Sequence, residues 1–131
     1  MEKSIFTKII KREIPGQFVF EDDRVVVLMD KFPAMKGQTL VIPKDQVDYL
    51  FDLPDDLYAH LWNVAKKTAQ AMDAALKPRR VCVVVEGFEV PHVHIRMYPV
   101  PENEPLRLKP TAMEEDDALT ELAETIKAHL T

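Results

Sequence analysis

The sequence feature that most constrains the fold is a run of seven residues in which two kinds of side chain alternate. From residue 92 the chain reads His-Val-His-Ile-Arg-Met-Tyr. Successive side chains of a β-strand point to opposite faces of its sheet. We therefore predict a strand over residues 90–98, with Val93, Ile95 and Met97 facing a hydrophobic core. The same geometry places the four other side chains in one row on the opposite face: His92, His94, Arg96 and Tyr98.

Four other segments have the composition of strands. Each is short, rich in β-branched or apolar residues and bounded by turn residues, which is typical of strands. Together with the alternating segment they predict a sheet of five strands. The four segments are residues 17–20, 24–29, 39–42 and 81–85.

Three segments have the spacing of helices. Ser4 can cap a short helix that ends before Pro15-Gly16. Residues 55–77 carry apolar side chains at three- and four-residue intervals, which indicates a long amphipathic helix. A capping box from Thr111 to Glu114 predicts a last helix over about 111–130. The order of elements predicts one α+β domain over residues 1–131, a mainly antiparallel sheet with helices on one side.

The composition argues against several classes of protein. The length of 131 residues suits a single core. A net charge of -5 argues against a nucleic-acid surface, which needs a dominant basic face. A single cysteine, Cys82, permits no internal disulfide and fits a reducing cytosol. Because no apolar stretch approaches the roughly 20 residues that cross a bilayer, we expect a cytoplasmic protein without membrane or nucleic-acid partners.

The row of polar side chains on the alternating strand allows three interpretations. Two histidines followed by an arginine can bind an anion, and a neutral imidazole can also act as a nucleophile. A half-exposed strand with polar residues facing outward would show the same alternation. A metal site would need further ligands, but His60 and His129 lie on predicted helices, and no carboxylate completes a metal-binding spacing. We therefore expect no metal here.

The alternating segment and its surroundings resemble the histidine triad (HIT) family of nucleotide hydrolases and transferases. The family motif is His-φ-His-φ-His-φ-φ, with φ apolar, and residues 91–99 read Pro-His-Val-His-Ile-Arg-Met-Tyr-Pro. Residues 4–33 resemble the family's apolar opening helix, Glu-Ile-Pro step and Glu-Asp-Asp turn. Residues 37–46, GQTLVIPKDQ, resemble its Gly-His-x-Leu-Val-Ile-Pro-Lys segment. Because the likeness runs in order from about residue 4 to residue 99, it is more specific than a lone His-x-His pair.

The resemblance implies a fold, an assembly and a chemistry. The implied fold is a five-stranded antiparallel sheet with a long central helix, a short N-terminal helix and a C-terminal helix. The implied assembly is a homodimer. The implied reaction is attack on the α-phosphate of a nucleoside phosphate derivative, such as a phosphoramidate or a dinucleoside polyphosphate. It passes through a nucleotidyl-histidine intermediate and requires no cofactor.

The resemblance also assigns roles to residues by their positions. It makes His94 the nucleophile and His92 the residue that helps to fix the imidazole of His94. Asp30 would accept hydrogen bonds from the ribose hydroxyls. The other candidates are apolar walls around a purine base, at Phe6, Ile10 and Leu28, and two further nucleotide contacts, at Gln38 and Glu89.

Four positions depart from the family pattern. Arg96 stands where the third motif histidine is expected, and Gln38 stands where the Gly-His pair has histidine. Phe88 replaces a common glutamine, and Val85 replaces a common asparagine. Arginine and glutamine can donate hydrogen bonds to phosphate oxygens but cannot shuttle a proton.

These departures lead to two functional hypotheses. In the first, the protein is an enzyme that favours substrates with good leaving groups, such as anhydrides, or a weakened catalyst of the same type. In the second, it is a nucleotide-binding sensor or adaptor that has lost efficient turnover. The role of Arg96 is also open, because the side chain can contact phosphate or turn outward to pair with Glu89 or Glu102.

Overall fold

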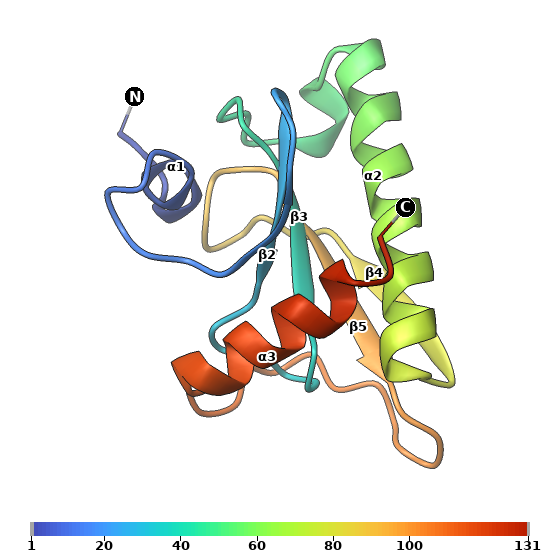
Figure 1. Ribbon diagram of the computed structural model, residues 1–131. Coiled ribbons are helices and arrows are strands. Elements are labelled where there is room, and N and C mark those ends of the chain that lie inside the picture. The colour runs from blue at the N-terminus through green and yellow to red at the C-terminus, as the bar shows by residue number, and fades with distance from the viewer. Residues whose placement is uncertain (1, 131) are drawn as a thin grey trace.

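The computed structural model of this chain, which describes residues 2–130, contains a five-stranded antiparallel sheet with helices on both faces (Figure 1). The spatial order is β1-β2-β3-β5-β4, and every neighbouring pair is antiparallel. The predicted α+β fold with its five-stranded sheet is confirmed. The strands are β1 (Phe18–Glu21), β2 (Val25–Met29), β3 (Thr39–Pro43), β4 (Arg80–Val84) and β5 (Ile95–Val100).

Two helices cover one face of the sheet and form the larger hydrophobic core. The long helix α2 (Asp55–Leu76) follows a short 3₁₀ turn, η1 (Leu50–Asp52), and runs beside α3 (Asp116–Lys127). Their buried apolar stripes pack against alternate side chains of the strands, as the helical spacing predicts. Among the described residues, no helix is long and apolar enough to cross a membrane.

The short helix α1 (Ile5–Ile10) lies on the opposite face of the sheet from α2, as Figure 1 shows. Its Phe6 packs in a smaller cluster with Val26, Leu28, Leu40 and Ile42. The expectation that all helices lie on one side is therefore wrong. Strands β2 and β3 are buried on both faces, so their nearly continuous apolar sequences need a second cover in addition to α2 and α3.

The strand that carries the histidines begins later than its alternation predicts. β5 starts at Ile95 and ends at Val100, whereas the predicted range was 90–98. Before Ile95 the backbone bonds outside the ladder, because the His92 amide donates to the Val90 carbonyl and the Val93 amide donates to the Val47 carbonyl. The alternation of side chains nevertheless persists, since Val93 enters the larger core while His92 and His94 face α1.

The C-terminal helix also begins later than predicted. α3 starts at Asp116 with Glu115 as its N-cap, so the capping box from Thr111 to Glu114 does not form. The Thr111 amide and hydroxyl both donate to the Pro33 carbonyl, and the Glu114 amide donates to the Lys31 carbonyl. These long-range bonds hold residues 111–114 along the loop that follows β2. Residues on either side of this segment, Leu108, Pro110 and Asp116, line the site described below.

Candidate active site

His94 lies immediately before β5 and is only 2% exposed. Its Nδ1 atom lies 2.7 Å from the backbone oxygen of His92. Because a carbonyl oxygen can only accept, Nδ1 carries the ring proton and Nε2 keeps its lone pair. Within the described chain, this Nε2 is covered from solvent and has no hydrogen-bond partner. The lone pair of Nε2 is therefore unused in this structure, and the atom is closed to solvent.

His92 is fully buried and held at both ring nitrogens. Its Nε2 lies 2.7 Å from the backbone oxygen of Pro43, so Nε2 carries the proton. Its Nδ1 lies 2.6 Å from the hydroxyl oxygen of Ser4. This ring does not line the cavity. That His92 helps to fix the imidazole of His94 stays a prediction; the contact between them is from the backbone oxygen of His92 to Nδ1 of His94.

Burial lowers the pKa of both histidines below the ordinary value of 6.5. For His94 the nearby positive charge of Arg96 lowers the pKa further, whereas the hydrogen bond to the His92 carbonyl and the charge of Asp30 oppose the shift. Both rings are therefore neutral at neutral pH. A neutral imidazole is the form that can act as a nucleophile.

Acidification is expected to destabilise the fold through these two rings. Below about pH 6.5, these histidines bind protons in the unfolded state but stay neutral in the folded state. The free energy of unfolding therefore falls as the pH falls. Above the unfolded pKa the stabilisation is complete, and the loss grows until the lowered folded pKa is reached. Each ring can contribute at most about 1.4 kcal/mol per pH unit in this window.

Urea unfolding between about pH 7.5 and about pH 5 measures this effect. The matched variant is His92→Gln, which removes one of the two titrating rings and should show a smaller decrease in unfolding free energy with falling pH. An unfolding free energy that stays constant through this range in the wild type would contradict the prediction.

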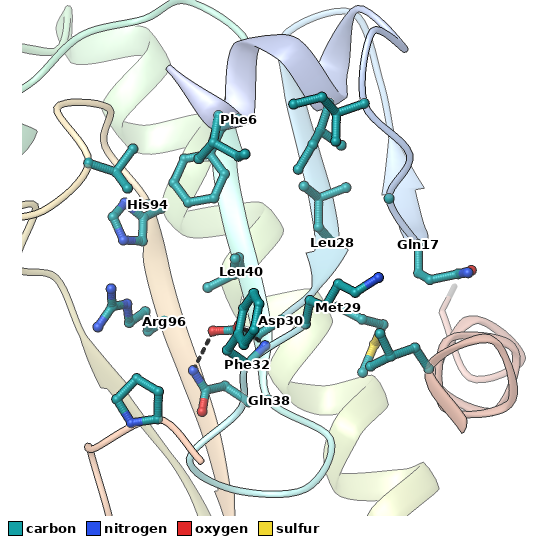
Figure 2. A pocket seen from close by; sticks show the side chains of 18 of the residues that line it. Phe6, Gln17, Leu28, Met29, Asp30, Phe32, Gln38, Leu40, His94 and Arg96 are labelled. Atoms are coloured by element: carbon teal, nitrogen blue, oxygen red, sulfur yellow. Dashed lines mark hydrogen bonds between the residues drawn. The ribbon is translucent and has the colours of Figure 1, made fainter. Parts of the chain in front are cut away.

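A cavity of about 380 Å³ opens beside His94, between α1, the end of β2 and the segment that leads to α3 (Figure 2). One wall is apolar and comes mainly from α1 and the following turn. A polar side is formed where β2, β3 and β5 come together. Seven of the nine predicted site residues line the cavity: Phe6, Leu28, Asp30, Gln38, Glu89, His94 and Arg96.

The apolar wall differs in one respect from the prediction. Ile10 does not line the cavity but packs partly buried against the cluster around Val26 and Ile42. Ile9 and Ile14 line the cavity instead. Ile5 and Ile9 are four residues apart and so lie on the same face of a helix. This spacing could have identified Ile9 as a wall residue from the sequence. The place of Ile14 depends on the turn after α1.

Asp30 is held in one orientation at the end of β2. Its Oδ1 accepts a hydrogen bond of 2.9 Å from the Phe32 amide, and its Oδ2 accepts one of 2.7 Å from Nε2 of Gln38. The Oε1 atom of Gln38 in turn accepts from the amides of Ala34 and Met35. Gln38 thus fixes both the loop after β2 and the carboxylate of Asp30, a role that its expected contact with phosphate did not anticipate (Figure 2).

Arg96 lies on β5, lines the cavity and forms an ion pair with Glu86 at 3.2 Å. The predicted outward partners, Glu89 and Glu102, were wrong. β4 and β5 are paired so that Val84 faces Arg96, and Glu86 lies two residues beyond Val84 on the same side of the chain. Because this ion pair is partly exposed, it contributes little stability, and the guanidinium can exchange Glu86 for another anion at small cost.

Two other positions that depart from the family pattern lie outside the cavity lining. Phe88 is 90% exposed and Val85 follows the end of β4. Among residues 2–130, no group of three or more histidine, cysteine, aspartate or glutamate side chains is arranged to hold a metal ion. The polar and charged side chains that line the cavity are those of Gln17, Asp30, Lys31, Gln38, Glu89, His94, Arg96 and Asp116.

Comparison with known proteins identifies the class to which this fold and site correspond. Residues 11–102 match the HIT domain. An uncharacterised HIT-like protein of Methanocaldococcus jannaschii is 36% identical over 99 residues, which are 72% of this chain and 77% of that protein. The hit protein of Bacillus subtilis is 31% identical over 103 residues, 75% of this chain and 71% of its own. The chain belongs to the HIT family, whose members are generally nucleotide-binding hydrolases or transferases.

Solved structures agree with this assignment over nearly the whole chain. A HIT-like protein involved in cell-cycle regulation from Bartonella henselae superposes with a TM-score of 0.88 at 30% identity, covering 98% of this chain and 96% of its own. A hypothetical histidine triad nucleotide-binding protein from Sulfolobus tokodaii gives a TM-score of 0.86 at 28% identity, covering 95% of this chain and 90% of its own. The similarity therefore includes α1 and α3, which border the cavity.

Proposed function

We propose that the protein is a hydrolase or transferase that acts at the α-phosphate of a nucleoside phosphate derivative, with His94 as its nucleophile. The observation that carries the proposal is the unpartnered Nε2 of His94, which belongs to a neutral ring at the border of a cavity. A buried nitrogen with an unused lone pair is costly unless a ligand completes it. Because Nε2 is covered from solvent, an arriving phosphate must displace neighbouring side chains to reach it.

The cavity offers a place for each part of a nucleotide. Arg96 lies two residues beyond His94 and can bind phosphate oxygens as a permanent cation. The carboxylate of Asp30, held by Phe32 and Gln38, can accept hydrogen bonds from both ribose hydroxyls. The apolar wall from Phe6 to Ile14 suits the flat face of a base, and we propose a purine because it has the larger face.

The reaction that we propose proceeds in two displacements. The lone pair of Nε2 of His94 forms a bond to the α-phosphorus, while the bond to the leaving oxygen or nitrogen breaks and the leaving group departs with that electron pair. The leaving group takes its proton from water or from the substrate itself. In the second displacement, the oxygen of water or of another acceptor forms a bond to phosphorus and releases its proton to solvent, the N–P bond breaks, and Nε2 regains its lone pair.

The experiment that tests the proposal is intact-mass analysis after mixing with substrate. The protein is incubated separately with an adenosine phosphoramidate and a dinucleoside polyphosphate, quenched in base and weighed. We expect a nucleotidyl adduct on the wild-type protein and release of the leaving group in solution. Tight nucleotide binding without adduct or turnover would contradict the proposal and favour the sensor or adaptor function.

We also propose that the protein forms a homodimer through β4. This strand ends the sheet, so one row of its backbone groups lies on the edge. Val83 on β4 and Phe88 beyond it are exposed and apolar. A second copy can add its own β4 in antiparallel orientation across a two-fold axis. Sedimentation velocity at micromolar concentration is expected to give a dimer, and a persistent monomer there would contradict this assembly.

A further inference from the structure

Ser4 connects the first turn of α1 to the buried histidine of the site. It is the N-cap of α1, and its hydroxyl oxygen accepts a hydrogen bond of 3.0 Å from the Thr7 amide. The same oxygen lies 2.6 Å from Nδ1 of His92, a residue 88 positions later in the chain. Ser4 is buried, although serine is usually exposed. Its oxygen also lies 3.3 Å from the Thr7 hydroxyl, so the Ser4 hydroxyl takes part in three contacts, of which only the one with the Thr7 amide caps the helix.

The direction of the hydrogen bond between Ser4 and His92 follows from the other side of the ring. Nε2 of His92 faces the Pro43 carbonyl, so it must carry the proton of a neutral ring. Nδ1 then holds a lone pair and needs a donor. The hydroxyl of Ser4 can supply its single proton, and the 2.6 Å contact is shorter than the 3.3 Å contact with the Thr7 hydroxyl. The Thr7 hydroxyl is farther from Nδ1, at 3.4 Å. Ser4 and the Pro43 carbonyl thus hold the same tautomer of His92 from the two sides of its ring.

The next contact connects His92 to the proposed nucleophile. The His92 backbone oxygen accepts the Nδ1 proton of His94, so the position of residue 92 decides which nitrogen of His94 keeps its lone pair. α1 also contacts the His94 ring directly, because the centroid of the Phe6 ring lies 4.8 Å from that of His94. The first turn of α1 therefore contacts both histidines.

The N-terminal segment is itself fixed by Gln46, which follows β3. Its Oε1 accepts from the Ser4 amide and from the Thr7 hydroxyl, each at 2.8 Å. Its Nε2 donates to the Glu2 carbonyl, also at 2.8 Å. Three separate hydrogen bonds thus hold the segment where the Ser4 hydroxyl reaches His92. A fixed donor is better suited than a mobile one to impose a tautomer on a buried ring.

We propose that Ser4 is a positioning residue for the reaction, because its hydroxyl fixes the neutral Nε2-protonated tautomer of His92 and, through the His92 carbonyl, the orientation of His94. This inference rests on the proposed function for the role of His94. It assigns to α1 a second task besides forming the apolar wall. The effect passes through His92, so Ser4 itself does not touch the substrate.

The first test is independent of any substrate. Nitrogen-15 NMR of the histidine rings reports which ring nitrogen is protonated. We expect wild-type His92 to be protonated at Nε2 and unprotonated at Nδ1, and Ser4→Thr to give the same pattern. We expect the Nδ1 resonance to shift in Ser4→Gly. An Nδ1-protonated His92 in the wild type, or an unchanged Nδ1 resonance in Ser4→Gly, would overturn the inference.

The second test separates the hydroxyl from the helix cap. Glycine at an N-cap costs only a few tenths of a kcal/mol relative to serine, so Ser4→Gly mainly removes the donor to His92, whereas Ser4→Thr keeps it. We expect kcat to fall on the order of ten-fold in Ser4→Gly, with KM nearly unchanged, and to recover in Ser4→Thr. Equal kcat values in Ser4→Gly and wild type would show that Ser4 acts only as a helix cap.

The two tests also separate this inference from the proposed function. If the wild-type protein forms no nucleotidyl adduct, the proposed function fails, while the NMR pattern still decides whether Ser4 sets the tautomer of His92. If the adduct forms but Ser4→Gly forms it at the wild-type rate, the proposed function stands and the positioning role of Ser4 is wrong.

Discussion

Replacing His94 with alanine is expected to abolish the nucleotidyl adduct and to lower turnover by at least about a thousand-fold. The variant lacks the Nε2 lone pair that would bond to phosphorus, and no other nitrogen of the described chain occupies that place in the cavity. The ribose and base contacts at Asp30 and Phe6 remain. Nucleotide affinity measured by calorimetry should therefore change by only a few-fold, while intact-mass analysis finds no adduct.

The matched control is His129→Ala, because His129 is an exposed histidine on the segment after α3 and lies outside the cavity. It should form the adduct at the wild-type rate. A His94→Ala protein that is folded and still forms the adduct would show that the nucleophile is another residue. If His94→Ala loses nucleotide binding as well as turnover, the cavity itself has changed in the variant. Urea unfolding of the variant beside the wild type shows whether its fold is intact.

A substitution at Arg96 is expected to increase activity. Replacing Arg96 with histidine is expected to raise turnover of phosphoramidates on the order of a hundred-fold, with a much smaller change for dinucleoside polyphosphates. An amine leaving group needs a proton as the P–N bond breaks, and an imidazole at position 96 can donate one, whereas a guanidinium cannot. A polyphosphate leaves readily without that proton. The loss of the ion pair between Arg96 and Glu86 should cost little stability because it is partly exposed.

Two variants separate proton donation from phosphate binding at this position. Arg96→Gln removes the charge and offers no proton, so it should slow both classes of substrate. Glu86→Gln frees Arg96 from its 3.2 Å partner and should strengthen phosphate binding without adding a proton donor. If Arg96→His is folded and turns over phosphoramidates no faster than the wild type, the hypothesis that Arg96 determines the leaving group is wrong.

Much of the fold follows from short-range patterns. The long stripe of α2, the N-cap at Ser4 and the strand segments are encoded within a few residues, because helix periodicity, capping and side-chain alternation are local. Where long-range bonds compete, the prediction failed. Thr111 and Glu114 bond to the loop after β2 and delay the start of α3, and the amides before Ile95 bond outside the ladder and delay the start of β5.

The candidate site shows the same division. The sequence by itself determined the alternating row, its pair of histidines and the place of Arg96 two residues beyond His94, because a strand's side-chain period is fixed at two. Burial in the folded protein is what keeps both histidines neutral. Only the tertiary structure decided that Gln38 holds Asp30, that Glu86 pairs with Arg96, and that Ser4 donates to His92. Each of those contacts joins side chains from different elements, and their meeting depends on how the sheet, α1 and the loops pack, which no local pattern specifies.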